Sequence, residues 1–412
     1  MFFGQIEPFA FLYERSFNMD LAIHEHNELR HALGTTGARV HLLRSLAIRL
    51  AREDPEIVSR LRNYAKRIVS FEGARGEVNR ARHEFEKNLP ELGIQTLFNI
   101  IVLRPSIYLE RKKGVRVIFP RVSLDVPLAN LYFMRDQQVA SDKGLIVGRM
   151  SKPQRRNEPI LTETILEMAG VNAVHRVVGP GTFEGGDFIP AGKFAVIGVG
   201  DRTNLNGASQ VLQHGVGFEE MALVHQPAHP LLPSNRPDPM IDMHLDTYLN
   251  FPGKQIAVGC IPLLKAAKVE VYQKSSSGRY KKKSNSPSLY DYLTEKDFII
   301  IPITTLEQMC YASNFLCVKD RKILAIEVEK VVKEVLRNLE SKARTDPRRY
   351  QALLHEARRD LERLKHSDQF FPHKREFQEL SIEVTSLQFQ EITGGYGGIR
   401  CMTCALSRKP SN

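Results

Sequence analysis

The stretch K-F-A-V-I-G-V-G-D-R-T-N-L-N-G-A-S-Q-V-L-Q-H, Lys193–His214, contains the unit that decides the fold of this chain. Its first part, Phe194–Val199, is a short apolar run rich in valine, isoleucine and phenylalanine, which is typical of a buried β-strand. Its second part, Asn206–Gln213, has the apolar spacing of a helix. A strand that leads into a helix is the unit from which α/β proteins are built.

The same unit recurs in both directions along the chain. The helical pattern Leu161–Met168 follows a strand-like run around Ile146, and Thr305–Met309 follows a run around Ile300. Other strand-sized runs are Ala222–Val224, Gln255–Val258, Phe315–Val318 and Ile382–Val384. The alternation predicts an α/β fold. The units have similar lengths without being identical, which favours a pseudo-symmetric assembly.

Two segments carry a helical pattern without strands. The first, charged and poor in proline, predicts a helical insertion at about residues 54–97. The second predicts a helical insertion at about residues 326–365, divided in two by T-D-P-R-R at Thr345–Arg349. We therefore expect a single domain over residues 1–412 that carries two helical insertions.

Composition limits the classes of protein to which the chain can belong. With 42% apolar and 25% charged residues, it is typical of a globular protein. No apolar run approaches the roughly 20 residues of a membrane span, and the N-terminus has no basic region and carries Glu7, unlike a signal peptide. Five sparse cysteines predict no disulfide framework. We expect a cytoplasmic protein without a membrane partner.

The net charge of +11 raises the question of nucleic-acid binding. The excess of basic residues lies in a serine-rich stretch, Gln273–Ser288, and in the helical stretch Arg344–Lys365. Neither is interleaved with aromatic residues or carries a groove-reading motif. Such charge runs are usually solvated surface, so we expect no nucleic-acid partner.

Four polar clusters follow or precede apolar runs and can carry chemistry. They are N-L-Y-F-M-R-D (Asn130–Asp136), F-E-G-G-D-F (Phe183–Phe188), M-H-L-D-T (Met243–Thr247) and G-G-I-R-C (Gly397–Cys401). Together they supply carboxylates, a histidine and a thiol. A nucleophilic thiol must become a thiolate, which a histidine or a cationic substrate favours. Several carboxylates around one pocket favour a planar cation such as a guanidinium.

Individual residues of these clusters also have structural interpretations. His244 alone is compatible with a buried histidine of the core, and Asp187 is compatible with a bond to the backbone of its own turn. Cys401 and Cys404 have the spacing of a redox pair or of half a zinc site, but no second C-x-x-C and no H-x-x-x-H follows. We expect no metal, and we expect Cys404 to be a small buried apolar residue in a final strand.

With these four motifs in this order, the chain resembles the arginine deiminases of the guanidino-group-modifying superfamily. The resemblance spans Asn130 to Cys404 and implies a five-bladed pseudo-symmetric α/β propeller with an inserted helical bundle. The family normally opens with an extra strand and hairpin before the helix that corresponds to Met19–Leu33. This chain reaches that helix after a short apolar prelude only, a departure from the family that leaves the completeness of the first blade open. Tyr396 lies where some members of the family carry a mobile arginine.

The resemblance also implies a role for each candidate residue. Cys401 matches the nucleophile, His244 the general acid/base, and Glu184 the carboxylate paired with that histidine. Asp136 and Asp246 match the carboxylates that hold the guanidinium nitrogens. The positions that match binding of the amino-acid end of arginine are Asn130, Phe133, Arg155 and Arg202.

The implied function is that of a hydrolase of arginine metabolism. It converts L-arginine to L-citrulline and ammonia through a covalent S-alkylthiouronium on Cys401, without metal or cofactor. The sequence leaves three alternatives open: an arginine dihydrolase that yields ornithine, an amidinotransferase, and an inactive arginine-binding homologue. It predicts L-arginine as the small-molecule partner and leaves a homo-oligomer open.

Overall fold

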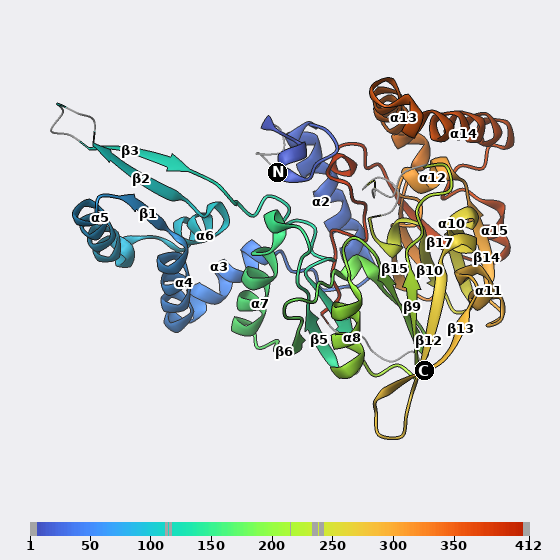
Figure 1. Cartoon of the computed structure of the whole chain (residues 1–412), viewed down its shortest axis with the longest axis horizontal. Coiled ribbons are helices and arrows are strands. Elements are labelled where there is room, and N and C mark those ends of the chain that lie inside the picture. The colour runs from blue at the N-terminus through green and yellow to red at the C-terminus, as the bar shows by residue number, and fades with distance from the viewer. Residues whose placement is uncertain are drawn as a thin grey trace. The chain divides into compact units, whose positions relative to one another are not determined.

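The computed structural model describes residues 6–111, 114, 118–214, 216–232, 238 and 243–406 (Figure 1). The chain divides into two compact units. Unit 1 comprises Met1–Val40, Tyr132–Lys152 and Ala173–Asn412, and unit 2 comprises His41–Leu131 and Pro153–Asn172. The segments of unit 2 form a hydrophobic core of their own. A single catalytic domain over residues 1–412 with helical insertions stays a prediction.

The described strands of unit 1 form four sheets that share one pattern. In each sheet two strands pair antiparallel, and a third pairs parallel to the second. The strands are β4 (Gln138–Ser141), β5 (Gly144–Val147) and β6 (Ala173–Arg176); β7 (Phe188–Ala191), β8 (Phe194–Val199) and β9 (Glu220–His225); β10 (Leu249–Gly253), β11 (Ile256–Cys260) and β14 (Ile299–Ile303); and β15 (Leu316–Lys319), β16 (Lys322–Ile326) and β17 (Glu383–Leu387). The second sheet continues through β12 (Lys268–Lys274) and β13 (Tyr280–Ser286).

Helices lie between the parallel strands, since a parallel pair needs a crossover connection. The strand–helix unit predicted from Lys193–His214 is present as β8, which is buried along its whole length, followed by α8 (Leu205–His214). The other connecting or adjoining helices of unit 1 are α10 (Ile261–Ala266), α11 (Leu289–Thr294), α12 (Thr305–Met309) and α15 (Arg375–Glu379). The result is the mixed α/β fold that the sequence predicts.

The second predicted helical insertion contains two long helices, α13 (Val328–Thr345) and α14 (Pro347–Ser367). They separate at Asp346, whose side chain accepts from the backbone N–H of Arg349 and caps α14, and Pro347 occupies the first turn of α14. One face of each helix is apolar and buried in the core of unit 1. Among the described residues, no helix combines the length and the apolar character needed to cross a membrane.

Unit 2 is not purely helical, which corrects the prediction for residues 54–97. Its helices are α3 (Leu43–Glu53), α4 (Pro55–Ile68), α5 (Arg75–Asn88), α6 (Ile94–Leu103) and α7 (Glu158–Met168). The run S-F-E-G forms strand β1 (Ser70–Gly73), which pairs parallel to β2 (Ser106–Arg111) beside β3 (Ile118–Ser123). A strand of four residues is too short for an alternation of apolar and polar residues to be recognised between two helical patterns. The strand with which β1 pairs, β2, also lies outside residues 54–97.

The C-terminal segment of unit 1 is held by the N-terminal segment. The carboxylate of Glu25, in α2 (Met19–Thr35), accepts from the backbone N–H groups of Gln390, Glu391 and Ile392 at 2.8 to 2.9 Å. These amides begin the short helix η6 (Ile392–Gly395), where a negative charge is favourable. Figure 1 shows α2 beside the C-terminal segment. A tail that would otherwise fray is therefore fixed before it reaches Cys401.

The glycines before Cys401 are required by close packing. The left-handed backbone conformation falls on Tyr396, with φ of 63°. A Cβ atom at Gly397 would lie 2.5 Å from the ring of Phe133, and one at Gly395 would collide with the hydroxyl of Tyr132. The tail thus lies directly against the aromatic side chains that precede Asp136.

We predict that Glu25→Gln destabilises the protein by about 1–3 kcal/mol, the usual cost of leaving buried hydrogen-bonding groups unpaired. A neutral amide offers one acceptor oxygen where the carboxylate offers two. Chemical denaturation gives the free energy of unfolding, and the amides of residues 390–392 should exchange hydrogen faster. Glu28→Gln, on the exposed face of the same helix, is the matched control. Equal stability of the two variants would contradict this anchoring role.

Candidate active site

The sequence motifs lie at corresponding places in the repeated sheets of unit 1. Asp136 precedes β4, Glu184 precedes β7, and His244 precedes β10, so each lies shortly before the first strand of a sheet. Their side chains meet, although they come from distant parts of the sequence. One ligand-type atom of each lies within 4.8 Å of the others. The repeated topology therefore gathers the three residues in one place.

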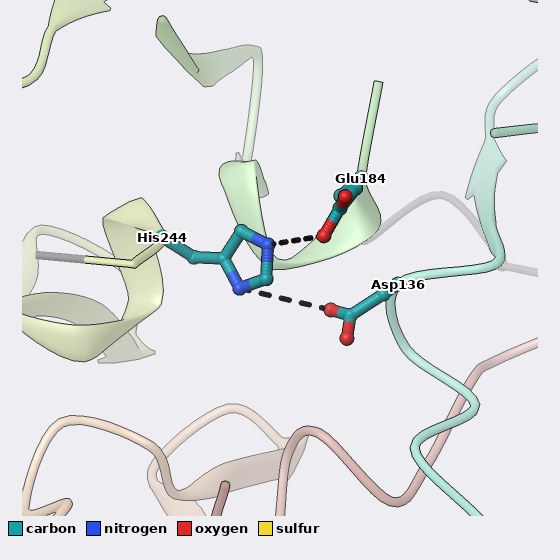
Figure 2. Close-up of side chains that lie close together, drawn as sticks. All are labelled: Asp136, Glu184 and His244. Carbon is teal, nitrogen blue, oxygen red and sulfur yellow. Dashed lines mark hydrogen bonds and ion pairs between the residues drawn. The ribbon is translucent and has the colours of Figure 1, made fainter. Parts of the chain in front are cut away.

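His244 is at the centre of this cluster (Figure 2). Its Nε2 lies 2.9 Å from Oε2 of Glu184, and its Nδ1 lies 3.8 Å from Oδ1 of Asp136. All three side chains are buried. The second oxygen of Glu184 accepts from the backbone N–H of Ser151 at 2.8 Å. The carboxylates therefore hold the ring from both of its nitrogen atoms.

Two opposing effects decide the charge of His244. Burial lowers the pKa of the ring, because it disfavours the imidazolium cation. The carboxylates of Asp136, Glu184 and Asp187 outweigh burial and raise the pKa to about 9. At neutral pH the ring is therefore protonated, and it can act as an acid before it acts as a base.

Backbone hydrogen bonds join the loops that carry these residues. The N–H of Gly185 donates to the carbonyl of Asp136 at 3.1 Å, and the N–H of Arg135 donates to the carbonyl of Cys401 at 2.9 Å. The loop of Asp136 thus lies between the loop of Glu184 and the loop of Cys401. This arrangement places the backbone of Cys401 beside the loop that carries Asp136.

Asp246 lies in the same motif as His244 and is fully buried. Its Oδ2 lies 2.5 Å from Nη1 of Arg400, whose Nη2 donates to the carbonyl of Phe188 at 2.7 Å. Its Oδ1 is buried and has no hydrogen-bond partner within the described part of the chain. A buried acceptor without a donor is unfavourable. Asp246 therefore accepts one guanidinium of the protein itself and retains an oxygen for a further donor.

Cys401 is buried, and its surroundings suppress ionisation in the absence of substrate. Burial raises the pKa of the thiol, and the negative charges of Asp246 and Asp136 raise it further. Hydrogen bonds from Asn314 and from the backbone of Gly398 oppose this effect. That His244, together with a cationic substrate, favours the thiolate stays a prediction.

Cys404 also differs from its expected environment. Residues Thr403 and Cys404 are irregular backbone, so the expected final strand is absent at these described positions. The thiol of Cys404 is half-buried and donates to the carbonyl of Gln138 at 3.3 Å. Neither Cys401 nor Cys404 forms a disulfide among the described cysteines. The thiol of Cys404 therefore forms a hydrogen bond with the first residue of β4.

Two further residues of the site, Ser313 and Asn314, were not predicted from the sequence. Oδ1 of Asn314 accepts from the backbone N–H of Cys401 at 3.2 Å, and its carbonyl accepts from the N–H of Arg400 at 3.0 Å. The hydroxyl of Ser313 donates to the carbonyl of Asp246 at 3.1 Å. Asn314 precedes β15 as Asp136 precedes β4, so its position in the fourth sheet of the pattern was the one available signal.

Arg202 and Phe133, two of the predicted substrate-binding residues, are also buried in unit 1. Nη1 of Arg202 lies 3.8 Å from Oε2 of Glu184, and its Nε lies 3.3 Å from Asp201. The ring of Phe133 packs on Tyr132 and on the glycines of the tail. Arg202 is thus adjacent to the central pair, and Phe133 supports the loop of Cys401.

Asn130 and Arg155, the other predicted substrate-binding residues, belong to unit 2. Both meet Glu158, a fully buried carboxylate. Its Oε1 accepts from the backbone N–H of Asn130 at 3.2 Å, and its Oε2 accepts from Nε of Arg155 at 2.9 Å. The sequence analysis did not single out Glu158. Contact of Asn130 and Arg155 with a substrate stays a prediction.

The cluster of Asp136, Glu184 and His244 has the ligand types and spacing that a metal ion requires. Its internal contacts favour another use. Nε2 of His244 bonds to Glu184, and Nδ1 faces Asp136, so each ring nitrogen is directed at a carboxylate. A histidine ligand needs one nitrogen directed at the metal. This arrangement suits an imidazolium acid.

A family model described as arginine deiminase matches residues 9–408. An arginine deiminase of Halobacterium salinarum is 25% identical over 272 residues, which cover 50% of this chain and 55% of that protein. The chain thus spans about half the length of this curated relative.

Two solved structures are also similar. A dimethylarginine dimethylaminohydrolase from Pseudomonas aeruginosa, in complex with citrulline, has 18% identity and a TM-score of 0.39 over 68% of this chain and 76% of that chain. The N-terminal domain of ArgZ, an arginine dihydrolase from cyanobacteria, has 13% identity and a TM-score of 0.43 over 74% of this chain and 81% of that chain. Because the family model matches nearly the full sequence, the chain belongs to the arginine deiminase family.

Proposed function

We propose that this protein hydrolyses L-arginine to L-citrulline and ammonia, with Cys401 as the nucleophile. The observation that carries the proposal is a buried histidine, protonated at neutral pH, that lies between two carboxylates, one of which, Asp136, also acts on the buried thiol of Cys401. Membership of the arginine deiminase family supports the same reaction. A binding site of this kind suits a guanidinium, which is planar, cationic and rich in donors.

Substrate binding activates the thiol in this proposal. Asp136 and Asp246 raise the pKa of Cys401, so a cation that pairs with these carboxylates removes part of the penalty on the thiolate. The unpartnered Oδ1 of Asp246 accepts an N–H of the substrate guanidinium. The thiol proton then leaves to solvent, and Sγ faces the guanidinium carbon. The nucleophile is thus activated only when substrate is present.

The first half of the reaction forms the covalent intermediate. Sγ of Cys401 bonds to the guanidinium carbon, and one terminal C–N bond breaks. His244 gives its proton to the departing nitrogen, which leaves as ammonia. The pKa of about 9 keeps this proton available at neutral pH. The product on the enzyme is an S-alkylthiouronium.

The second half releases citrulline. The neutral imidazole takes one proton from water, and the water oxygen bonds to the same carbon. The C–S bond then breaks to restore the thiolate, and the new hydroxyl loses its proton to solvent as the C=O of citrulline forms. Glu184 keeps the ring oriented through its bond to Nε2 and stabilises the imidazolium that forms again. No step requires a metal or a cofactor.

We also propose that the four similar sheets of unit 1 are blades of the five-bladed pseudo-symmetric propeller that the resemblance implies. Each has an antiparallel pair followed by a parallel strand, and each is preceded by a loop that contributes to the site. This repetition supports the propeller, and the fifth blade stays a prediction. An experimental structure would test the closure of the ring.

A product assay with L-arginine tests the proposed function. We expect one citrulline and one ammonia for each arginine consumed, in the presence of a metal chelator as in its absence. Ornithine with two ammonia would indicate a dihydrolase, and transfer of the amidino group to an added amine would indicate an amidinotransferase. Binding of arginine without turnover would indicate an inactive homologue. Each of these three outcomes contradicts the proposal.

We predict that Cys401→Ala abolishes turnover and still binds arginine, because the carboxylates that hold the guanidinium remain. Cys404→Ala is the control, since its thiol donates to the backbone carbonyls of Gln138 and Ala405 and has no role in the proposed chemistry, and it should retain most of the rate. Acid quenching followed by peptide mass spectrometry should find an arginine-derived adduct on Cys401. An adduct on Cys404, or equal loss of rate in both variants, would show that the nucleophile is wrongly assigned.

We predict that Arg202→Ala raises KM for arginine by about 10- to 100-fold, since a charge-assisted hydrogen bond contributes about 1.5–3 kcal/mol. Agmatine lacks the carboxylate that Arg202 is proposed to bind, so the wild-type enzyme should process it poorly. Lys152→Ala is the matched control, because Lys152 also pairs with Asp201 but has no proposed contact with substrate. Wild-type rates on agmatine equal to those on arginine would rule out this role for Arg202.

A further inference from the structure

Asp187 is a fully buried carboxylate that the proposed chemistry does not use. It ends the short helix η4 (Gly185–Asp187), which directly follows Glu184. Instead of bonding its own turn, its Oδ1 accepts from the backbone N–H of Leu245 at 2.9 Å. Leu245 directly follows His244 and begins the short helix η5 (Leu245–Thr247). One carboxylate therefore links the turn of Glu184 to the turn of His244.

The carboxylate is itself anchored to the central strands. The same Oδ1 accepts from Nε2 of Gln226 at 2.6 Å. Gln226 follows β9, and its backbone N–H donates to the carbonyl of Val199 at the end of β8. Gly198 leaves room for the contact, because a Cβ atom there would collide with Oδ1 of Asp187. The link between the two turns is thus fixed to the sheet.

η4 also supports the His244 ring directly. A Cβ atom at Gly186 would lie 2.6 Å from Nδ1 of His244 and 2.7 Å from its Cγ, so the ring lies against the glycine backbone. Gly186 therefore limits the position of the ring on one side, while Asp187 holds the amide that follows it. Glu184 meets the ring at Nε2. Glu184, Gly186 and Asp187 thus all constrain His244, which lies 60 residues after Glu184 in the sequence.

We propose that Asp187 is a positioning residue that fixes the His244–Glu184 pair by tying η4 to η5. Its consequence for the rate rests on the proposed function, whereas its consequence for the geometry of His244 does not. Charge supports the same role, since Asp187 is one of the carboxylates that raise the pKa of His244. Burial raises the pKa of Asp187 itself to about 7, against the opposing effect of His244.

Two variants separate position from charge. Asp187→Ala leaves the N–H of Leu245 without its acceptor, and we expect kcat to fall by about 100-fold with little change in KM, the effect of misplacing a catalytic group by about 1 Å. Asp187→Asn keeps an oxygen acceptor and removes the charge. We expect it to recover most of kcat while the pKa of His244, followed by NMR of ¹⁵N-labelled histidine, falls below that of the wild type.

A second buried carboxylate provides the matched control. Oδ2 of Asp360, in α14, accepts from the backbone N–H of Leu306 at 3.1 Å, the same kind of link in another part of unit 1. Asp360→Ala should lower the free energy of unfolding without changing kcat or the NMR signals of His244. The signals are assigned with His244→Gln.

The NMR measurement distinguishes failure of this proposal from failure of the proposed function. If the wild-type protein does not turn over arginine, the proposed function fails, and the His244 signals still report whether Asp187 positions the ring. Unchanged His244 signals and an unchanged kcat in Asp187→Ala would overturn the proposal. If Asp187→Ala does not fold, a loss of kcat of about 100-fold in Asp187→Asn would overturn it, because this variant keeps the oxygen acceptor that the link to Leu245 requires.

Discussion

The contact between His244 and Glu184 is the interaction on which the site depends. Ionised groups taken out of water are costly unless they are paired and hydrogen-bonded. The imidazolium and the carboxylate satisfy this condition together, with Nε2 of His244 2.9 Å from Oε2 of Glu184. The other oxygen of Glu184 accepts from the backbone N–H of Ser151, and Nη1 of Arg202 lies 3.8 Å from Oε2. Removing either partner would leave the other charge buried. The stability of the site therefore requires that the surrounding loops hold His244 and Glu184 in contact.

The repeated sheets explain how residues from distant loops reach this pair. In each of the four similar sheets, the loop before the first strand contributes a polar side chain: Asp136, Glu184, His244 or Asn314. A rigid scaffold that presents several loops is a common way to position catalytic groups. Here the same topological position is used repeatedly, with a different chemical group at each occurrence.

The segment that carries Cys401 imposes a second requirement, because it has little regular secondary structure of its own. Glu25 accepts from the amides that begin η6, and Asn314 accepts from the backbone N–H groups of Arg400 and Cys401. Glycines allow the tail to lie against Phe133. A segment with little secondary structure of its own is thus ordered by side chains from three other parts of unit 1.

The sequence by itself determined the α/β class, strands such as β8, helices such as α12, and the chemical types gathered in four motifs. These properties follow from local periodicity and residue type. Only the tertiary structure decided that β1 pairs with β2, that Asp187 reaches Leu245 across 58 residues, and that Arg400 occupies one oxygen of Asp246. The tertiary structure also decided that the pKa of the Cys401 thiol is raised above its ordinary value. Burial and electrostatic fields depend on neighbours that are remote along the chain, and local patterns carry no information about them.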